Sequence, residues 1–455
     1  MSSETVSLPE PRISGDRIPG PGILESWRFV LTWGEDRITP VATLHERYGD
    51  VVRLNLGNLV IFLTLRPDLA HDCLVSKHKD FHKDRYYFFL KLILGHGLLT
   101  SEEDFHLRQR RMIQPAFHRE RIAAYGEAMT HFSKQMRTQW QDGQEADIYS
   151  AMGKLALDIV AKTLFNSDVS DEAERVAHIL DTVLSMDAQF VSPIGKILSK
   201  LPLPATRRFY AAIAQLDEIL YRMIREHRAS GDQGDLLSML LMAQDEDDGK
   251  GMSDKQVRDE ATTLFLAGHE TTAIALTWTW YLLSQNPEVE ARMHEEIDRV
   301  LEGRDPSAAD YNNLSYTYRV FKESMRLFPP AYMIGREAIR DTEVGPYSLR
   351  KGEIMVMSQY LIHRSPKYYT DPERFDPDRW LPENCEGLPK FAYFPFGGGR
   401  RLCVGEPFAW MEGVLVIATL AQKWRFELKP GHQIGLNPSV TLRPKGGMPM
   451  IAHAR

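Results

Sequence analysis

The residues with the most distinctive chemistry lie between Phe394 and Glu406, where the sequence reads FPFGGGRRLCVGE. This stretch combines one cysteine, Cys403, with four glycines and two arginines, and an apolar, helix-like segment follows it. The N–H groups and the positive dipole end at the start of a helix stabilise a thiolate placed there. A soft sulfur ligand on a glycine-bent loop, with cations beside it, suits an iron porphyrin. The alternative is a buried structural cysteine in a glycine-rich turn.

The cysteine loop also matches a known pattern. Read as Phe396-x-x-Gly399-x-Arg401-x-Cys403-x-Gly405, it resembles the haem-binding signature of the cytochrome P450 family at every specified position. The resemblance implies haem b (iron protoporphyrin IX) as the cofactor, with Cys403 as the iron ligand and Phe396, Arg401 and Gly405 among the residues that bind it. Cysteine ligation of haem iron favours cleavage of the O–O bond. Three further segments resemble the family in the expected order, and together they cover most of the chain.

The second segment is residues 267–272, Ala-Gly-His-Glu-Thr-Thr, in a long apolar helix predicted to follow Ser253. Two threonines and an acid are poor choices there on helix propensity alone. In one interpretation the threonines bond back to the preceding turn and Glu270 is paired elsewhere. The resemblance implies instead that Glu270 and Thr271 form an acid–alcohol pair that delivers protons to oxygen, beside a locally widened helix turn. It also implies that the small Ala267 leaves room for oxygen above the haem.

The third segment supplies cations for the two haem carboxylates. His106 and Arg110 are four residues apart and share one face of a predicted helix. The resemblance implies that both bind haem propionates. Arg336, which follows a Phe-Pro-Pro turn, resembles another propionate ligand of the family, and Arg401 can pair with a propionate as well. Three arginines and a histidine are thus predicted to hold the macrocycle.

The fourth segment contains Glu323 and Arg326, which are three residues apart on a predicted helix. As a lone exposed pair they would contribute well under ~1 kcal/mol. The resemblance implies that the pair is buried and joined by Arg374 from a Pro-Glu-Arg-Phe segment. We interpret this trio as structural, and we expect it to clamp the irregular passage 365–394 behind the cysteine loop.

The resemblance further implies an apolar substrate pocket. The connector 190–203 is predicted to form a lid over it. Such a pocket favours a hydrophobic substrate such as a fatty acid, a terpenoid or a steroid. The predicted lining residues are Phe88, Phe89, Ile93, Phe265, Leu266, Ala331, Met333 and Ile334.

The elements that must position these residues are mostly helices. Residues 104–242 show helical periodicity, whereas 51–65 and 334–357 alternate like strands. Strand signals near both ends of the chain favour one interwoven domain. We therefore predict a mainly α fold with a minor β part, in which residues 22–455 form a single large domain of the cytochrome P450 type around a long central helix. Residues 1–21 are expected to be a flexible leader.

The charge, the cysteine count and the hydropathy of the chain argue against several classes of protein. The 455 residues include 55 Lys and Arg against 62 Asp and Glu, a net charge of −7 that disfavours a nucleic-acid binder. Three cysteines cannot form a disulfide framework and indicate a reducing compartment. The first residues lack an apolar signal region, and no window approaches the ~18 apolar residues of a membrane span. A soluble, cytoplasmic protein is expected.

The combined prediction is a haem-thiolate monooxygenase that inserts one atom of O2 into a hydrophobic substrate. No segment after the last predicted helix resembles a flavin or iron–sulfur domain, so electrons are expected from a separate ferredoxin or flavodoxin with its reductase. A monomer is expected. Two alternatives stay open: a peroxide-using haem-thiolate enzyme and a non-enzymatic haem sensor. Both have less need of an acid–alcohol pair such as Glu270 and Thr271.

Overall fold

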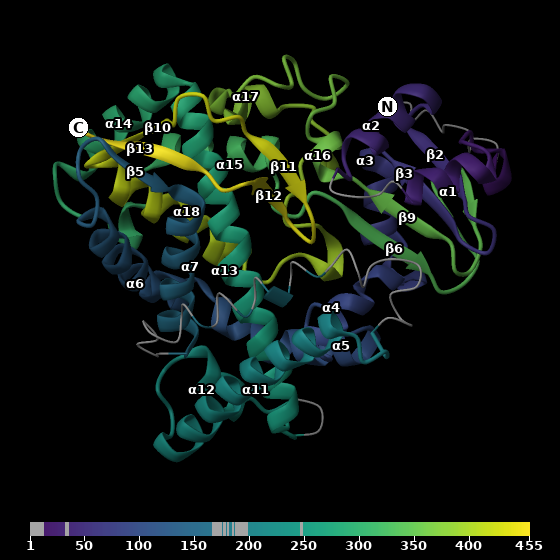
Figure 1. The fold of residues 1–455 in the computed structure, drawn as a ribbon, viewed down its shortest axis with the longest axis horizontal. Coiled ribbons are helices and arrows are strands. Elements are labelled where there is room, and N and C mark those ends of the chain that lie inside the picture. The colour runs from purple at the N-terminus through teal and green to yellow at the C-terminus, as the bar shows by residue number, and fades with distance from the viewer. Residues whose placement is uncertain are drawn as a thin grey trace, which may run out of the picture.

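The computed structural model describes residues 13–31, 36–165, 199–245 and 249–455, with a few single positions between 175 and 186. Helices account for 57% of it and strands for 14%, which confirms a mainly α fold with a minor β part. The strands β2, β3, β6 and β9 gather at one end of the molecule, and most of the long helices lie at the other (Figure 1).

The predicted long helix is α13 (Asp254–Gln285), and it runs through the middle of the molecule (Figure 1). It begins with a capping box in which Ser253 and Gln256 satisfy each other's backbone N–H groups. It ends at Asn286, where Pro287 prevents continuation. Helices packed around it bury most of its faces, which is why its sequence is apolar nearly all round. Every residue from 254 to 285 is α-helical, so the predicted widened turn is not seen.

The remaining helices surround α13 and the sheet. The longer ones are α1 (Ile23–Leu31), α2 (Thr39–Tyr48), α5 (Glu103–Ile113), α6 (Arg119–Arg137), α7 (Ile148–Phe165), α11 (Pro204–Ser230), α14 (Pro287–Leu301), α15 (Ser315–Leu327) and α18 (Glu406–Ala421). The short ones are α3 (Pro67–His71), α4 (Phe88–Leu94), α12 (Leu236–Met242), α16 (Gln359–Ile362) and α17 (Pro382–Cys385). Helices α7, α11, α15 and α18 all contact α13, which makes it the centre of the helical part.

The main sheet has the strand order β2-β3-β9-β6-β4, so β4 is an edge strand. Its strands are β2 (Val51–Asn55), β3 (Val60–Thr64), β4 (Phe81–Lys83), β6 (Ile334–Ala338) and β9 (Ile354–Met357). Strand β4 pairs antiparallel with β6, and this register sets Lys83 directly opposite Arg336. The sheet thus joins two segments that are about 250 residues apart in sequence.

Smaller sheets join further distant segments. Their strands are β5 (Gln144–Asp147), β7 (Thr342–Val344), β8 (Tyr347–Leu349), β10 (Trp424–Leu428), β11 (Gly435–Pro438), β12 (Leu442–Lys445) and β13 (Pro449–Ala454). Strands β10, β13 and β5 form one sheet, and β11 pairs with β12. The pairing of β13 with β5 ties the last described residues to the first half of the chain, as expected for one interwoven domain.

The predicted leader is wrong in its second half. Residues 13–21 are described, and within them β1 (Ile13–Ser14) pairs in parallel with β8. Ile18 is buried in the apolar cluster beneath the main sheet. Hydrogen bonding and burial therefore hold this segment, despite its polar, Pro- and Gly-rich sequence. Residues 1–12 lie outside the described part of the chain.

Candidate active site

The loop that carries Cys403 is folded by its own backbone hydrogen bonds. The N–H of Gly397 donates to the carbonyl of Phe394 at 2.9 Å, and the N–H of Cys403 donates to the carbonyl of Phe396 at 3.1 Å. The Phe396 ring packs against Trp410 of α18, with 5.4 Å between ring centroids. Helix α18 begins at Glu406, three residues after the cysteine. The predicted arrangement of a cysteine just before a helix is therefore present.

Solvent reaches the Cys403 side chain even though protein surrounds it closely. The residue is exposed, but burial of the thiol among neighbouring atoms raises its pKa. Hydrogen bonding from the backbone of Gly405 and Glu406 acts in the opposite direction and is the weaker effect. The protein alone thus favours the neutral thiol, and a cation at the sulfur is what would stabilise the thiolate.

Two glycines of the loop are explained by protein contacts rather than by a flat ligand. Gly399 has φ of +64°, and a Cβ added there would lie 2.0 Å from the carbonyl oxygen of Leu74. A Cβ at Gly398 would lie 2.5 Å from the ring of Phe391. At both positions the chain itself fills the space that a side chain would need.

The predicted propionate ligands lie close together. His106 and Arg110 lie on α5, Arg336 on β6 and Arg401 in the cysteine loop. Burial, followed by the charge of Arg401, lowers the pKa of His106 to about 3. Burial also lowers the pKa of Arg401, to about 10, and the charges of Arg336 and Arg110 contribute. Hydrogen bonds hold two of the arginines in this region: Arg110 donates to the Leu402 carbonyl at 2.6 Å, and Arg401 donates to the Ser101 carbonyl at 2.8 Å.

Lys83 is a further member of this cluster that the sequence did not reveal. It stands opposite Arg336 in the β4–β6 pair, and like charges at such positions are destabilising. Burial, followed by the charges of Arg336 and Arg401, holds the pKa of Lys83 well below its ordinary value. Its Nζ donates to the carbonyl of Leu99. Only the strand register identifies Lys83, because nothing in the local sequence Phe-His-Lys-Asp marks it.

The charge of this cluster fits a ligand with two carboxylates. The carboxylate of Glu102 pairs with Arg401 and accepts the backbone N–H of Lys83 at 2.8 Å. Buried Asp84 also lies near, and burial raises its pKa to about 6. Against these two acids stand three arginines, Arg110, Arg336 and Arg401, together with Lys83, which leaves an excess of cationic groups. The two propionates of a haem would neutralise them.

The pKa of His106 gives a test on the cofactor-free protein. Because its folded-state pKa of about 3 lies below the ordinary value of 6.5, the unfolded chain binds the proton first on acidification. This contribution to stability is complete above pH 6.5 and declines as the pH falls toward 3. We expect His106→Phe to reduce the slope of the unfolding free energy against pH by about 1 kcal/mol per pH unit. The slope is measured by denaturant unfolding from pH 7 to pH 4.5. The same change at exposed His131 serves as the control for replacing a histidine by phenylalanine at the surface.

Thr271 and Ala267 share one face of α13, and solvent reaches both. Ala267 is exposed although it lies in the middle of a helix whose other faces are buried. The Thr271 hydroxyl donates to the Ala267 carbonyl at 2.7 Å. This is the back-bonded state that the structural interpretation of the Thr-Thr pair predicts.

Glu270 points elsewhere. Its Oε1 accepts hydrogen bonds from the Thr441 hydroxyl at 2.6 Å and from Nε of Arg443 at 2.7 Å, and its side chain is buried. Adjacent positions on an α-helix face directions about 100° apart, which separates this acid from the hydroxyl of Thr271. Glu270 thus forms an ion pair with Arg443 of β12 and does not contact the Thr271 hydroxyl.

The Glu323–Arg326 pair is fully buried, and its geometry is bidentate. Arg326 donates to the two oxygens of Glu323 at 2.9 and 2.8 Å, and both side chains are 0% exposed. The third cation is Arg379, whose Nε lies 3.3 Å from the Glu323 carboxylate. The prediction of Arg374 in this role is wrong. Arg374 is exposed, and only its backbone carbonyl takes part, by accepting from Arg326 at 3.1 Å.

The predicted pocket residues fall into two groups. Phe89, Ile93, Phe265 and Leu266 belong to one apolar cluster, and Val404, next to Cys403, packs against it. The other group follows α15 in the chain. Ile334 packs against the apolar cluster beneath the main sheet, and Met333 packs against two other apolar clusters. Phe88 and Ala331 are half-buried. Residues 190–198 of the predicted lid lie outside the described part.

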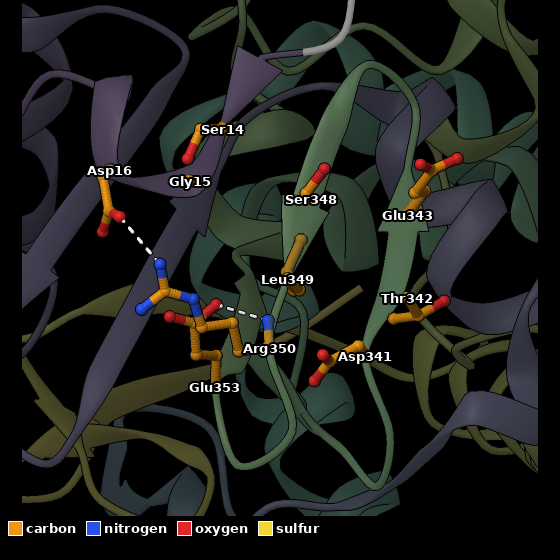
Figure 2. A pocket seen from close by; sticks show the side chains of 10 residues that line it. All are labelled: Ser14, Gly15, Asp16, Asp341, Thr342, Glu343, Ser348, Leu349, Arg350 and Glu353. Carbon is orange, nitrogen blue, oxygen red and sulfur yellow. Dashed lines mark hydrogen bonds and ion pairs between the residues drawn. The ribbon is translucent and has the colours of Figure 1, made fainter.

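A surface pocket of about 460 Å³ lies apart from all of these residues. Figure 2 shows Arg350 within it, bonded to the Asp16 carboxylate at 2.9 Å and, through its backbone N–H, to Glu353 at 2.8 Å. None of the predicted site residues lines it. Its lining consists of Ser14, Gly15, Asp16, Asp341, Thr342, Glu343, Ser348, Leu349, Arg350 and Glu353.

Comparison with known proteins agrees with the site. The family model described as Cytochrome P450 matches residues 20–449. Cyclooctatin synthase of Streptomyces melanosporofaciens is 42% identical over 90% of this chain and 89% of its own. Cyclooctat-9-en-7-ol 5-monooxygenase of the same organism is 39% identical over the same shares. Pentalenene oxygenase of Streptomyces avermitilis is 36% identical over 85% of this chain and 86% of its own. The crystal structure of the cytochrome P450DA heme domain superposes with a TM-score of 0.84 at 26% identity, covering 98% of this chain and 99% of that one.

The chain belongs to the cytochrome P450 family. It is a monooxygenase of that family with a haem-iron cofactor, and its substrate is oxidised with O2. Among the described residues, no helix is both long enough and apolar enough to cross a membrane.

Proposed function

We propose that this monooxygenase carries haem b and hydroxylates a terpenoid. The observation that carries the proposal is the similarity to cyclooctat-9-en-7-ol 5-monooxygenase and pentalenene oxygenase along most of the chain. The apolar cluster of Phe89, Ile93, Phe265 and Leu266 beside the cysteine loop supports it, because a hydrocarbon substrate needs apolar contacts.

Each site residue then has a defined part. The haem supplies oxygen activation, which ligation by a cysteine thiolate favours. Cys403 is the iron ligand, and Phe396 and Gly405 shape the loop around it. Lys83, Arg110, Arg336 and Arg401 bind the propionates, with neutral His106 as a hydrogen-bond donor.

Thr271 is the proton-handling group nearest the open face of α13, and Glu270 is the acid behind it. The Thr271 hydroxyl donates to Ala267, and a rotation about its χ1 angle would turn the hydroxyl toward the open face, where it can donate a hydrogen bond. The Glu270 carboxylate pairs with Arg443, and that contact must open before the acid can relay protons.

Thr271→Ala tests this assignment. We expect electron consumption to continue while the yield of product per NAD(P)H falls by about tenfold or more, with hydrogen peroxide released instead, because general acid catalysis typically contributes at least that much. Thr271→Ser should restore coupling, since it keeps the hydroxyl. Coupling is measured as product and peroxide formed per reduced cofactor.

Thr277→Ala is the matched control. Its hydroxyl bonds back to Ala273 at 2.7 Å, in the same helix and with the same geometry, but it is fully buried away from the open face. It should leave coupling at the wild-type level. Equal uncoupling in both variants would show that the loss comes from helix distortion, and Thr271 would then have no special role.

Electrons are proposed to come from a separate ferredoxin or flavodoxin with its reductase, in the cytoplasm, to a monomeric enzyme. Exposed Arg400, within the cysteine loop, offers a positive charge to an acidic carrier. The proposal is tested by reconstituting turnover with each carrier in turn.

The substrate class is tested by titrating the ferric enzyme with three panels: cyclic terpene hydrocarbons and alcohols, fatty acids, and steroids. Displacement of water by a bound substrate changes the haem spin state, which the Soret band reports. We expect saturable shifts with terpenoids and hydroxylated products on turnover. Tight binding and turnover of fatty acids alone would reject the terpenoid assignment.

A further inference from the structure

His363 directly follows α16, and its side chain is completely buried. The backbone N–H of Phe394, the first residue of the cysteine loop, donates to its Nε2 at 3.0 Å. Since a backbone N–H can only donate, Nε2 must carry a lone pair and the ring proton must lie on Nδ1. The imidazole is therefore a neutral acceptor in this contact.

The surroundings of the ring keep it neutral and fixed. Burial, and then the positive charge of Arg326, hold the pKa of His363 well below its ordinary value. The ring lies edge-on to Phe394, with centroids 5.5 Å apart, and tilted against Tyr393 at 5.1 Å. Both aromatic neighbours belong to the segment that enters the cysteine loop.

The same residue is bonded on its other side to the buried ion pair. The backbone carbonyl of His363 accepts from Nη1 of Arg326 at 2.8 Å, and Arg326 is held by both oxygens of Glu323. On the loop side, the Phe394 carbonyl accepts from Gly397, and the N–H of Cys403 donates to Phe396. His363 thus lies between the ion pair and the loop, with one hydrogen bond to each.

We propose that His363 is a positioning residue for the thiolate: its Nε2 lone pair fixes the Phe394 N–H and thereby the start of the loop that carries Cys403. The proposal rests on the assignment of Cys403 as the iron ligand. Without the acceptor, a buried N–H is left unsatisfied, and the loop gains by moving away to find another partner. A ligand held by a loop that can shift is lost more easily, because a site of this kind requires positions fixed to within about 0.5 Å.

Two amide variants test the role of the Nε2 lone pair of His363. His363→Gln places an amide oxygen at the reach of Nε2, whereas His363→Asn carries the same group one methylene shorter and cannot reach Phe394. His363→Phe keeps the ring contacts and removes the acceptor. The readout is the rate at which the ferrous carbonyl form loses the far-red Soret band of thiolate ligation, together with the haem reduction potential.

We expect loss of the thiolate band to be about tenfold faster in His363→Asn and His363→Phe, and within about twofold of wild type in His363→Gln. The reduction potential should shift in the first two variants only. If the Phe variant does not fold, the Gln and Asn pair still decides the question, since both bury an amide.

Tyr369→Phe is the control for general destabilisation of this region. The Tyr369 hydroxyl donates to the Ala392 carbonyl at 2.9 Å, two residues before Phe394, and is also buried. Tyr369→Phe should lower the melting temperature of the protein without accelerating loss of the far-red Soret band. Equal rates in the Gln and Asn variants, or an equal acceleration in Tyr369→Phe, would overturn the proposal. Absence of the thiolate band in the wild-type protein would instead reject Cys403 as the ligand.

Discussion

Replacing Cys403 with serine should remove both the thiolate signature and monooxygenase activity. The sulfur lies just before α18 and is the only soft donor of the FPFGGGRRLCVGE loop, so no other residue of that loop can replace it. A serine hydroxyl is a poor, weakly donating ligand that does not favour O–O cleavage as a thiolate does. The expected result is a ferrous carbonyl spectrum without the far-red Soret band, and product formation at background.

Cys385→Ser is the matched control for this change. The Cys385 thiol contacts the Arg379 carbonyl at 3.4 Å, in a contact that a hydroxyl can also make. We expect this variant to keep both the spectrum and the activity. A Cys403→Ser protein that kept the far-red band would show that the sulfur is not the ligand and would remove the basis of the proposed mechanism.

Glu323→Ala should prevent stable haem incorporation. The Glu323 carboxylate accepts five hydrogen bonds, from both donor groups of Arg326, from Arg379, from the Trp380 indole and from the backbone N–H of Asp376. Removing it leaves the fully buried Arg326 without its counter-charge, which typically costs about 3–5 kcal/mol. We expect haem content per chain, measured by absorbance, to fall several-fold, with a matching loss of melting temperature.

The exposed pair of Arg222 and Glu226 is the control for the effect of burial on the stability that an ion pair contributes. Its charged atoms are 3.7 Å apart at i,i+4 positions of α11, and both side chains are more than 40% exposed. Glu226→Ala should therefore change stability by less than about 0.5 kcal/mol and leave haem content at the wild-type level. A Glu323→Ala protein as stable and as haem-rich as this control would contradict the structural role of the buried cluster.

Features that depend on local sequence could be predicted. The capping residues and the proline that bound α13 are adjacent to it, so its limits follow from the sequence alone. The spacing of Glu323 and Arg326 on one helix likewise determines that they can pair. The haem-binding signature of the cysteine loop is contiguous, and it identified the family that the comparisons confirm.

Features that depend on long-range packing could not be predicted from the sequence. Arg374 and Arg379 lie in the same irregular passage, and only the path of the chain decides that Arg379 reaches Glu323 while Arg374 faces solvent. Glu270 is paired with Arg443, more than 170 residues away, across a contact that no local pattern marks. Lys83 joins the cation cluster only through the register of an edge strand.

That edge strand also has a consequence for how the enzyme is assembled. Strand β4 has a neighbour on one side only, and on that side Lys83 faces Arg336, so the nearby carboxylates of Glu102 and Asp84 are needed to offset the positive charge at this edge. A haem held with its propionates at these residues would add two negative charges to the same edge. Cofactor insertion and closure of the sheet edge are thereby thermodynamically linked, and each promotes the other.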